Sequence, residues 1–474
     1  MLPSDDNEIS YHLSFPIPYR TLFLVGAGIL AWATNLHFLH AFGIDVAGAM
    51  DLRGDIASSN GVIPTHRTAA YSYSTTFTRY NAVYQLFFSY SAFCFASWTI
   101  YRFLTRGDPL LVDSYGYIPV ITALTILLII ICPYNVFMKE ERERFTLAIK
   151  RCLFPPPNGP IYFSDVIFAD VGTSFARIFG DIWLSLCMLK PGNSILIPPS
   201  VEGWGAVVLP VIMSLPFFLR FRQCIIEYNS TLNDSRKPLF NAIKYATSFP
   251  VIFLSAAQRT VDSDLIKEKG RILAGQKWHG EHPLFRLWIL ATVVNSLYSF
   301  WWDVSQDWGL ELLQFDPPKK QDRQMPRVPI LTRITSQAPL SNRGSSDSLL
   351  SDQAIHAVEI QKHPYRQSCH GLRSILLYPR AIYPVLIFLN LVFRMSWSVK
   401  LSTHVSSTRD GTVAFFWLEV AELVRRWLWV FIRVEWESIK KAIEREPNLQ
   451  FDRASNDEND FEMVPAAPDA NSAI

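Results

Sequence analysis

Long apolar stretches alternate with short polar ones along most of this chain. A helix needs about 20 mostly apolar residues to cross the roughly 30 Å hydrocarbon core of a bilayer. By that measure the pattern predicts about nine spans, with eight or ten as open alternatives. The predicted spans cover residues 20–43, 80–103, 115–137, 162–189, 204–222, 239–258, 284–302, 374–402 and 411–432. The predicted fold is therefore all-α, a polytopic bundle of transmembrane helices.

The polar stretches divide the chain into parts. A short acidic segment, 1–19, lacks the basic start of a removable signal peptide, so the first span is expected to remain as an anchor. N-terminal helices are expected over 20–160 and a transmembrane core over 161–437. Within the core, 316–371 is rich in Pro, Ser, Gln and charge, and the tail 438–474 is acidic. Both are predicted to be disordered.

Composition supports this division. The 474 residues are 49% hydrophobic, 14% aromatic and only 18% charged, against about 25% charged in soluble domains. Aromatic side chains suit the two membrane interfaces. The net charge of +2 gives no footprint for a nucleic-acid partner. The six cysteines are scattered without a CxxC pair and are interpreted as small hydrophobic residues, so neither a metal nor a cofactor is expected.

Basic residues predict the orientation in the membrane. Lys and Arg crowd into 139–151, after the third span, and into 433–441, after the last, so both segments are expected in the cytosol. Nine spans then place the N-terminus on the lumenal or external side. The basic stretch 259–282 disagrees with this arrangement. The sequons at Asn229 and Asn233 fall on the predicted cytosolic side and are expected to be unglycosylated.

Charges inside the spans carry the functional signal. A charged side chain at mid-membrane costs about 2.5–3.5 kcal/mol, so such residues normally face a bundle interior or a wet cavity. In the fourth span, Asp170 and Thr173 share one helix face, and Arg177 and Asp181 are spaced to pair with each other. The alternative is a helix whose charges only neutralise one another.

The sixth and seventh spans each add charges. Lys244, beside Tyr245, precedes an apolar run and is either functional or a lysine that reaches the interface. Asp303 and Asp307 are four apart and face the same way, so they need cations from other helices unless they lie at a solvated helix end.

The last two spans carry arginines. Arg394 lies deep in the eighth span, and its alternative role is a salt bridge to a neighbouring helix. Glu422, Arg425 and Arg426 fall within about one turn of the ninth span, and Arg433 beyond them suits a basic anchor at the membrane surface. Cations and carboxylates nearly balance across the spans. Because Arg presents a planar fork of donors, several arginines and a lysine favour an oxyanion over a metal cation.

Several longer motifs resemble the EXS-domain family of phosphate exporters. The resemblance runs from about 162 to 437, and more weakly back to the first span. It rests on LPFFLRFRQCIIEY (215–228), NAIKYATSFPVIFLSA (241–256), LWILATVVNSLYSFWWDVSQDWGL (287–310), LLYPRAIYPVLIFLNLVFRMSW (376–397) and LEVAELVRRWLWVFIRVEWE (418–437). The resemblance implies a phosphate path lined by Asp170, Thr173, Lys244, Tyr245, Asp303, Asp307, Arg394, Trp397, Glu422, Arg425 and Arg426. Thr173 departs from the amide that the family has at this position.

The resemblance also implies a place in the cell. Long exporters of the family begin with an SPX domain, whereas about 20 residues precede the first predicted span here. The chain is thus similar to short fungal members in the Golgi membrane. Such a protein would move inorganic phosphate from the Golgi lumen to the cytosol, supporting glycosylation and retention of lumenal ER proteins, with its C-terminus in the cytosol.

Two other functions stay open beside a transporter that performs no chemistry. One is a membrane sorting factor that binds Golgi adaptors or glycosyltransferases through the 316–371 loop and the tail. The other is an intramembrane enzyme with Asp303 and Asp307 as an acid pair, which is disfavoured because no GxGD motif occurs. Besides phosphate and the lipid bilayer, a second copy of the chain is a further candidate partner.

Overall fold

A computed structural model shows how the spans are folded. It describes residues 13–50, 68–135, 137–155, 161–188, 204–230, 235–269, 283–310, 375–395 and 411–459, together with the single residues 11, 190, 194, 196, 312, 372 and 373. The chain forms two compact units, one of Met1–Gly309 with Leu376–Ile474 and one of Leu310–Ile375. The helices and the polar network described next belong to the first unit.

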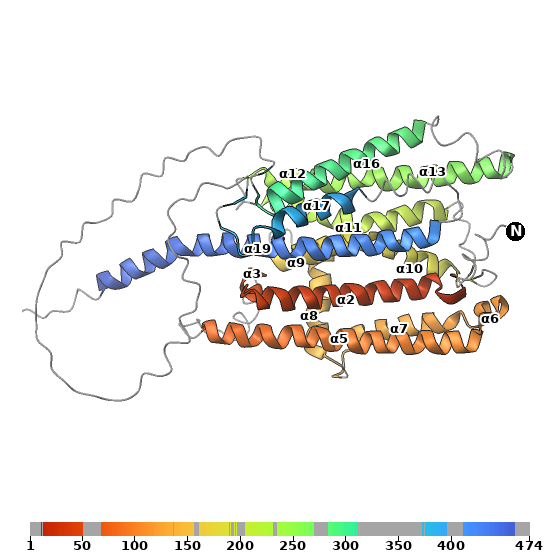
Figure 1. Cartoon of the computed structure of the whole chain (residues 1–474), viewed down its shortest axis with the longest axis horizontal. Coiled ribbons are helices and arrows are strands. Elements are labelled where there is room, and N and C mark those ends of the chain that lie inside the picture. The colour runs from red at the N-terminus through yellow and green to blue at the C-terminus, as the bar shows by residue number, and fades with distance from the viewer. Residues whose placement is uncertain are drawn as a thin grey trace, which may run out of the picture. The chain divides into compact units, whose positions relative to one another are not determined.

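Every secondary-structure element in the described residues is a helix (Figure 1). The bounds are α2 Ile17–Ala41, α3 Val46–Ala49, α5 Thr68–Thr105, α6 Pro109–Ser114, α7 Tyr117–Ile131, α8 Lys139–Leu153, α9 Phe163–Ser174, α10 Ala176–Met188, α11 Trp204–Asn229, α12 Lys237–Ala246, α13 Ser248–Lys269, α16 Pro283–Trp302, the π-helix η1 Asp303–Asp307, α17 Ile382–Arg394 and α19 Gly411–Asn459. This confirms the prediction of an all-α polytopic fold.

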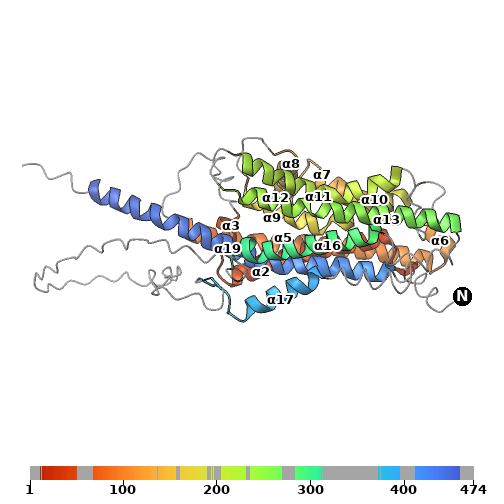
Figure 2. The same ribbon diagram turned by 90° about the horizontal axis from the view of Figure 1, so that it is seen from above.

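The long helices of this unit run side by side along one axis (Figures 1 and 2). Helix α2 contacts α5, α10 and α19, so the first predicted span packs against the last. Helix α2 is thus packed between other helices, whereas one side of α7 is exposed, because Leu124, Leu128 and Ile131 are all exposed. Such apolar exposure on a helix that is hydrophobic all round is typical of contact with lipid.

Five stretches are long and apolar enough to cross a membrane by length and composition. They are Ile17–Ala41, Pro109–Ile131, Val207–Asn229, Lys237–Val261 and Pro283–Asp307. The other predicted spans coincide with α5, with α9 followed by α10, with the short apolar helix α17, and with α19. Helices α9, α10 and α17 are short, α19 carries charges, and α5 is interrupted by uncharged polar residues such as Asn81, Gln85 and Ser89.

The basic segment that follows α7 is itself a helix, α8. Its first turn is acidic and its last turn is basic, an order that the helix dipole favours. Arg142 joins it to α7 by donating hydrogen bonds of 2.5–2.7 Å to four carbonyl oxygens, those of Ile129, Cys132, Tyr134 and Phe137. One buried guanidinium thus satisfies carbonyl groups that would otherwise be unpaired where α7 ends.

Helix α19 corrects the prediction for the C-terminal tail. A disordered segment was expected over 438–474, but α19 continues as a helix to Asn459. The loop predicted over 316–371 and residues 460–474 lie outside the described residues. Three of the five described cysteines, Cys94, Cys152 and Cys224, are buried.

Candidate functional site

Polar residues from six elements meet inside the first unit. The central network consists of four carboxylates and five cations: Asp170, Asp303, Asp307, Glu422, Arg220, Lys244, Arg394, Arg425 and Arg426. Several of these residues lie where a helix ends or changes type. Lys244 and Tyr245 close α12, Asp303 and Asp307 bound η1, and Arg394 is the last residue of α17. Backbone that departs from an α-helix at membrane depth normally lies inside the protein or lines a cavity.

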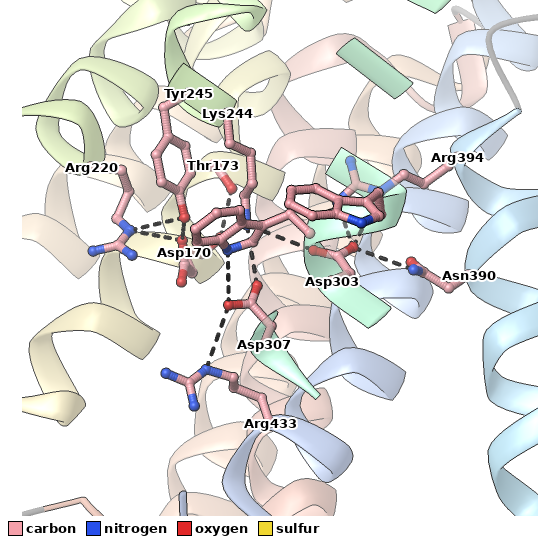
Figure 3. A network of polar contacts seen from close by, with 12 residues as sticks. Asp170, Thr173, Arg220, Lys244, Tyr245, Asp303, Asp307, Asn390, Arg394 and Arg433 are labelled. Atoms are coloured by element: carbon pink, nitrogen blue, oxygen red, sulfur yellow. Dashed lines mark hydrogen bonds and ion pairs between the residues drawn. The ribbon is translucent and has the colours of Figure 1, made fainter. Parts of the chain in front are cut away.

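Asp170 on α9 forms one end of the network (Figure 3). Its Oδ1 lies 2.8 Å from Arg220 Nε and accepts a hydrogen bond from the Tyr245 hydroxyl. Arg220 also donates to Gln223 Oε1 at 2.7 Å. Both Asp170 and Arg220 are almost completely buried. Sequence reasoning did not select Arg220, although it lies inside one of the motifs that resemble the family.

Asp303 forms the centre of the network and has no exposed side-chain surface. Its Oδ2 lies 2.6 Å from Arg394 Nη2, 3.7 Å from Arg425 Nη1 and 3.3 Å from the Asn390 amide nitrogen. Its Oδ1 lies 3.6 Å from Lys244 Nζ. One carboxylate therefore faces three cations from three helices, as the sequence predicted that it must.

Asp307 lies beside Asp303 and completes the pair (Figure 3). Lys244 Nζ donates to its Oδ2 at 3.1 Å, and the Trp302 indole donates to its Oδ1 at 3.2 Å. The π-helical turn keeps both aspartates facing Lys244, and π-helical turns occur frequently at functional sites. The alternative of a solvated helix end does not hold, because both side chains are buried.

Helix α19 supplies the two adjacent arginines. Arg425 donates from Nε to Glu422 Oε2 at 2.8 Å on the same helix. Arg426 instead donates to two hydroxyls of α9, Ser174 Oγ and Thr173 Oγ1, both at 3.0 Å. Among the described residues, Arg426 thus contacts hydroxyl groups rather than a carboxylate, and its guanidinium also lies 4.6 Å from the Trp429 ring centroid.

Arg433 extends the network along α19 and is more than a basic anchor at the membrane surface. Its Nε lies 3.9 Å from Asp307 Oδ1, and its Nη1 lies 3.0 Å from Glu437 Oε2. Lys440 also pairs with Glu437, at 3.2 Å. Burial alone would raise the pKa of Glu437, but Arg433 and Lys440 outweigh it and hold that pKa below its usual value. Glu437 is therefore a carboxylate at neutral pH.

Two other sequence predictions need comment. Arg177 Nε forms an ion pair with Glu419 Oε1 of α19, at 2.8 Å, so its closest carboxylate is not Asp181, the partner expected from spacing, although Asp181 also interacts with Arg177. A partner on a neighbouring helix cannot be seen from spacing within one helix. Trp397, which the family resemblance placed on the path, lies outside the described residues.

Charge counting shows what the network can do. Five cations face four carboxylates, so the network carries a surplus of one positive charge. At the far end, Arg433 and Lys440 share the single carboxylate of Glu437, so this end does not reduce the surplus. Within the described chain, no three His, Cys, Asp or Glu side chains gather in a way that could hold a metal ion. The chemistry is that of an anion site rich in bidentate donors.

The chain is similar over most of its length to several known proteins. The chain is 29% identical to Protein ERD1 homolog 1 of Schizosaccharomyces pombe, over 90% of this chain and 91% of that protein. It is 23% identical to Protein ERD1 homolog 2 of the same yeast, over 90% and 97% of the two chains. Human Solute carrier family 53 member 1 is 24% identical, over 66% of this chain and 38% of the human protein. The model of the EXS family matches residues 15–439, a range that contains the whole central network, and the chain belongs to the EXS family.

Proposed function

We propose that this protein moves inorganic phosphate across a membrane through the central network and performs no chemistry of its own. The observation that supports this most directly is the uncompensated positive charge. Because five cations share four carboxylates, a phosphate monoanion would neutralise the network without displacing a carboxylate. An anion of this size and shape also fits the paired donors of arginine.

Arg426 is the natural first contact for the anion. Its two hydrogen bonds run to neutral hydroxyls, and exchanging these for bonds to an ionised oxygen strengthens both. Arg425 and Arg394 already form ion pairs with carboxylates, so phosphate must compete with Glu422 and Asp303 to bind them. That competition keeps binding weak enough for release, which conduction requires.

The membrane and the direction of movement follow from the resemblance to short fungal family members. We propose a Golgi membrane, with phosphate moving from lumen to cytosol and the C-terminus in the cytosol. The basic helix α8 and the basic end of α19 support this orientation, since cytosolic segments are enriched in Lys and Arg. Removal of lumenal phosphate would then support glycosylation and the retention of lumenal ER proteins.

The test is phosphate flux in proteoliposomes that contain the purified protein. Arg394→Ala and Arg425→Ala should each abolish flux, because each removes a buried donor from the network. Arg144→Ala, on the exposed face of α8, is the matched control and should leave flux unchanged. Monodisperse elution and an unchanged helical circular dichroism spectrum show that the variants are folded. Wild-type flux in both network variants would refute the site, and no flux from the wild-type protein would refute the function.

A further inference from the structure

Helix α12, which carries Lys244, is separated from α13 by a break inside a single apolar stretch. Helix α12 ends at Ala246, Thr247 follows it, and α13 begins at Ser248. Pro250 explains the break, because proline has no backbone N–H and its ring clashes with the carbonyl group four residues earlier, that of Ala246. In a membrane, such breaks are stabilised by Ser and Thr side chains and by neighbouring helices.

Asn295 of α16 contacts both sides of this break. Its Oδ1 accepts hydrogen bonds from the Thr247 hydroxyl at 2.9 Å and from the Ser248 hydroxyl at 3.2 Å. Thr247 Oγ1 also lies 2.8 Å from the carbonyl oxygen of Lys244, so its single proton is shared between two acceptors. One amide side chain of α16 is thus connected to the start of α13 and, through Thr247, to the backbone of Lys244.

A second contact joins the same two helices on the other side of Lys244. Tyr298, three residues after Asn295 on α16, donates a hydrogen bond of 3.0 Å to the Phe240 carbonyl oxygen. Phe240 lies four residues before Lys244, and Thr247 lies three residues after it. The two contacts with α16 therefore lie on either side of Lys244 along the chain.

Helix α16 leads directly into the carboxylates that Lys244 contacts. Asn295 precedes Asp303 by eight residues, about two turns of helix. Lys244 Nζ lies 3.1 Å from Asp307 Oδ2 and 3.6 Å from Asp303 Oδ1 (Figure 3). Because lysine has a flexible four-carbon stem, the position of its ammonium group depends on where its backbone is held. The contacts between α12 and α16 thus bear on the distance between this cation and the two aspartates.

We propose that Asn295 is a positioning residue for phosphate: by joining α12 to α16 at the break, it keeps Lys244 beside the two aspartates, where the ammonium group can contact the anion. The effect on phosphate rests on the proposed transport function, whereas the contact between the helices can be tested without transport. Asn295 acts through Lys244 and does not itself bind the anion. Loss of the contact should weaken phosphate binding about two- to tenfold, the usual effect of one hydrogen bond.

The first measurement is hydrogen–deuterium exchange of the purified protein in detergent, read on peptides that cover α12. Thr247→Val removes the hydroxyl and keeps the shape of the side chain, and Asn295→Leu does the same for the amide. Both should speed exchange of the α12 amides about two- to tenfold, whereas Thr247→Ser should keep the wild-type rate. Thr292→Val is the matched control, because the Thr292 hydroxyl donates within α16, to the Trp288 carbonyl oxygen at 2.7 Å. Wild-type exchange in both Thr247→Val and Asn295→Leu would overturn the contact.

The second measurement is the dependence of phosphate flux on phosphate concentration in proteoliposomes. Thr247→Val and Asn295→Leu should raise KM about two- to tenfold at an unchanged maximal flux per folded molecule. Thr247→Ser and Thr292→Val should keep the wild-type KM. A merely structural role would lower the maximal flux and leave KM unchanged, and that result, or wild-type kinetics in both test variants, would overturn the positioning role. Absence of flux from the wild-type protein, with the difference in exchange present, would refute the transport function and leave the contact between α12 and α16 standing.

Discussion

Removing the charge of Asp303 tests the architecture of the central network most directly. Asp303 is completely buried and forms ion pairs with Arg394, Lys244 and Arg425 at 2.6, 3.6 and 3.7 Å. Asp303→Asn keeps the shape of the side chain and one acceptor oxygen but leaves three cations without their shared carboxylate. Loss of one partner of a buried ion pair costs about 3–5 kcal/mol. We expect the free energy of unfolding to fall by about 3 kcal/mol, near the lower end of that range, because the amide oxygen still accepts a hydrogen bond from Arg394.

Phosphate should restore part of that lost stability. The substitution raises the surplus of the network from one positive charge to two, so an added anion gains more in the variant than in the wild-type protein. A ligand at 100 times its dissociation constant stabilises the folded state by about 2.7 kcal/mol. Tighter binding in Asp303→Asn should therefore produce a larger phosphate-dependent shift than in the wild-type protein at the same concentration.

The assay is unfolding of the purified protein in detergent, with and without phosphate. Asp165→Asn, which breaks the ion pair with Arg151, is the control, and it should lose stability without any extra gain from phosphate. The reasoning is refuted if Asp303→Asn is as stable as the wild-type protein, or if phosphate stabilises both proteins equally.

Three further predictions concern the scaffold and the orientation. Gly309→Ala should destabilise the fold by about 1–3 kcal/mol in the same unfolding assay, because φ is +61° there and an added Cβ would clash with the Trp436 ring. Arg142→Ala should lower stability by at least about 2 kcal/mol, since it removes hydrogen bonds from a charged donor, while flux per folded molecule stays unchanged; lost flux in the folded variant would contradict a purely structural role. Asn229 and Asn233 should carry no glycan when the protein is expressed in yeast, so endoglycosidase treatment should not change its electrophoretic mobility, and a shift would reverse the predicted orientation.

Much of the network could be predicted from the sequence because a charge inside an apolar span is conspicuous. Lys244, Asp303, Asp307 and Arg394 each interrupt a run of hydrophobic residues, and the structure brings all four together. The need of two neighbouring aspartates for cations from other helices was a physical requirement, and Lys244 meets it at 3.1 Å from Asp307.

Residues near the predicted ends of spans were harder to judge. Arg220 lay two residues before the predicted end of the fifth span, where a basic residue is ordinary. The structure shows that α11 continues to Asn229, so Arg220 lies inside the helix and pairs with Asp170. The continuation of the helical pattern through Gln223, three residues later and bonded to Arg220, was the available signal.

The particular residue that serves as a partner on another helix could not be predicted from spacing. Spacing within one helix suggested Asp181 for Arg177, but the choice of Glu419 depends on how α10 packs against α19. The π-helical turn at Asp303–Asp307 is equally invisible to a pattern that assumes α-helical spacing. Both features depend on how the helices pack in three dimensions, which the spacing of residues in a single sequence does not show.

The distribution of partners within the network has a consequence for how an anion could pass through it. A cation that is fully occupied by a carboxylate gives up that contact only at a cost of several kcal/mol in a buried site. Arg426 carries no such cost, because it releases hydroxyls of Thr173 and Ser174. Ser174 also donates to Glu422, so an anion bound at Arg426 would lie next to the Glu422–Arg425 pair. An anion should therefore bind first at Arg426, where it displaces neutral hydroxyls, and reach Arg425 and the cations around Asp303 only in competition with carboxylates.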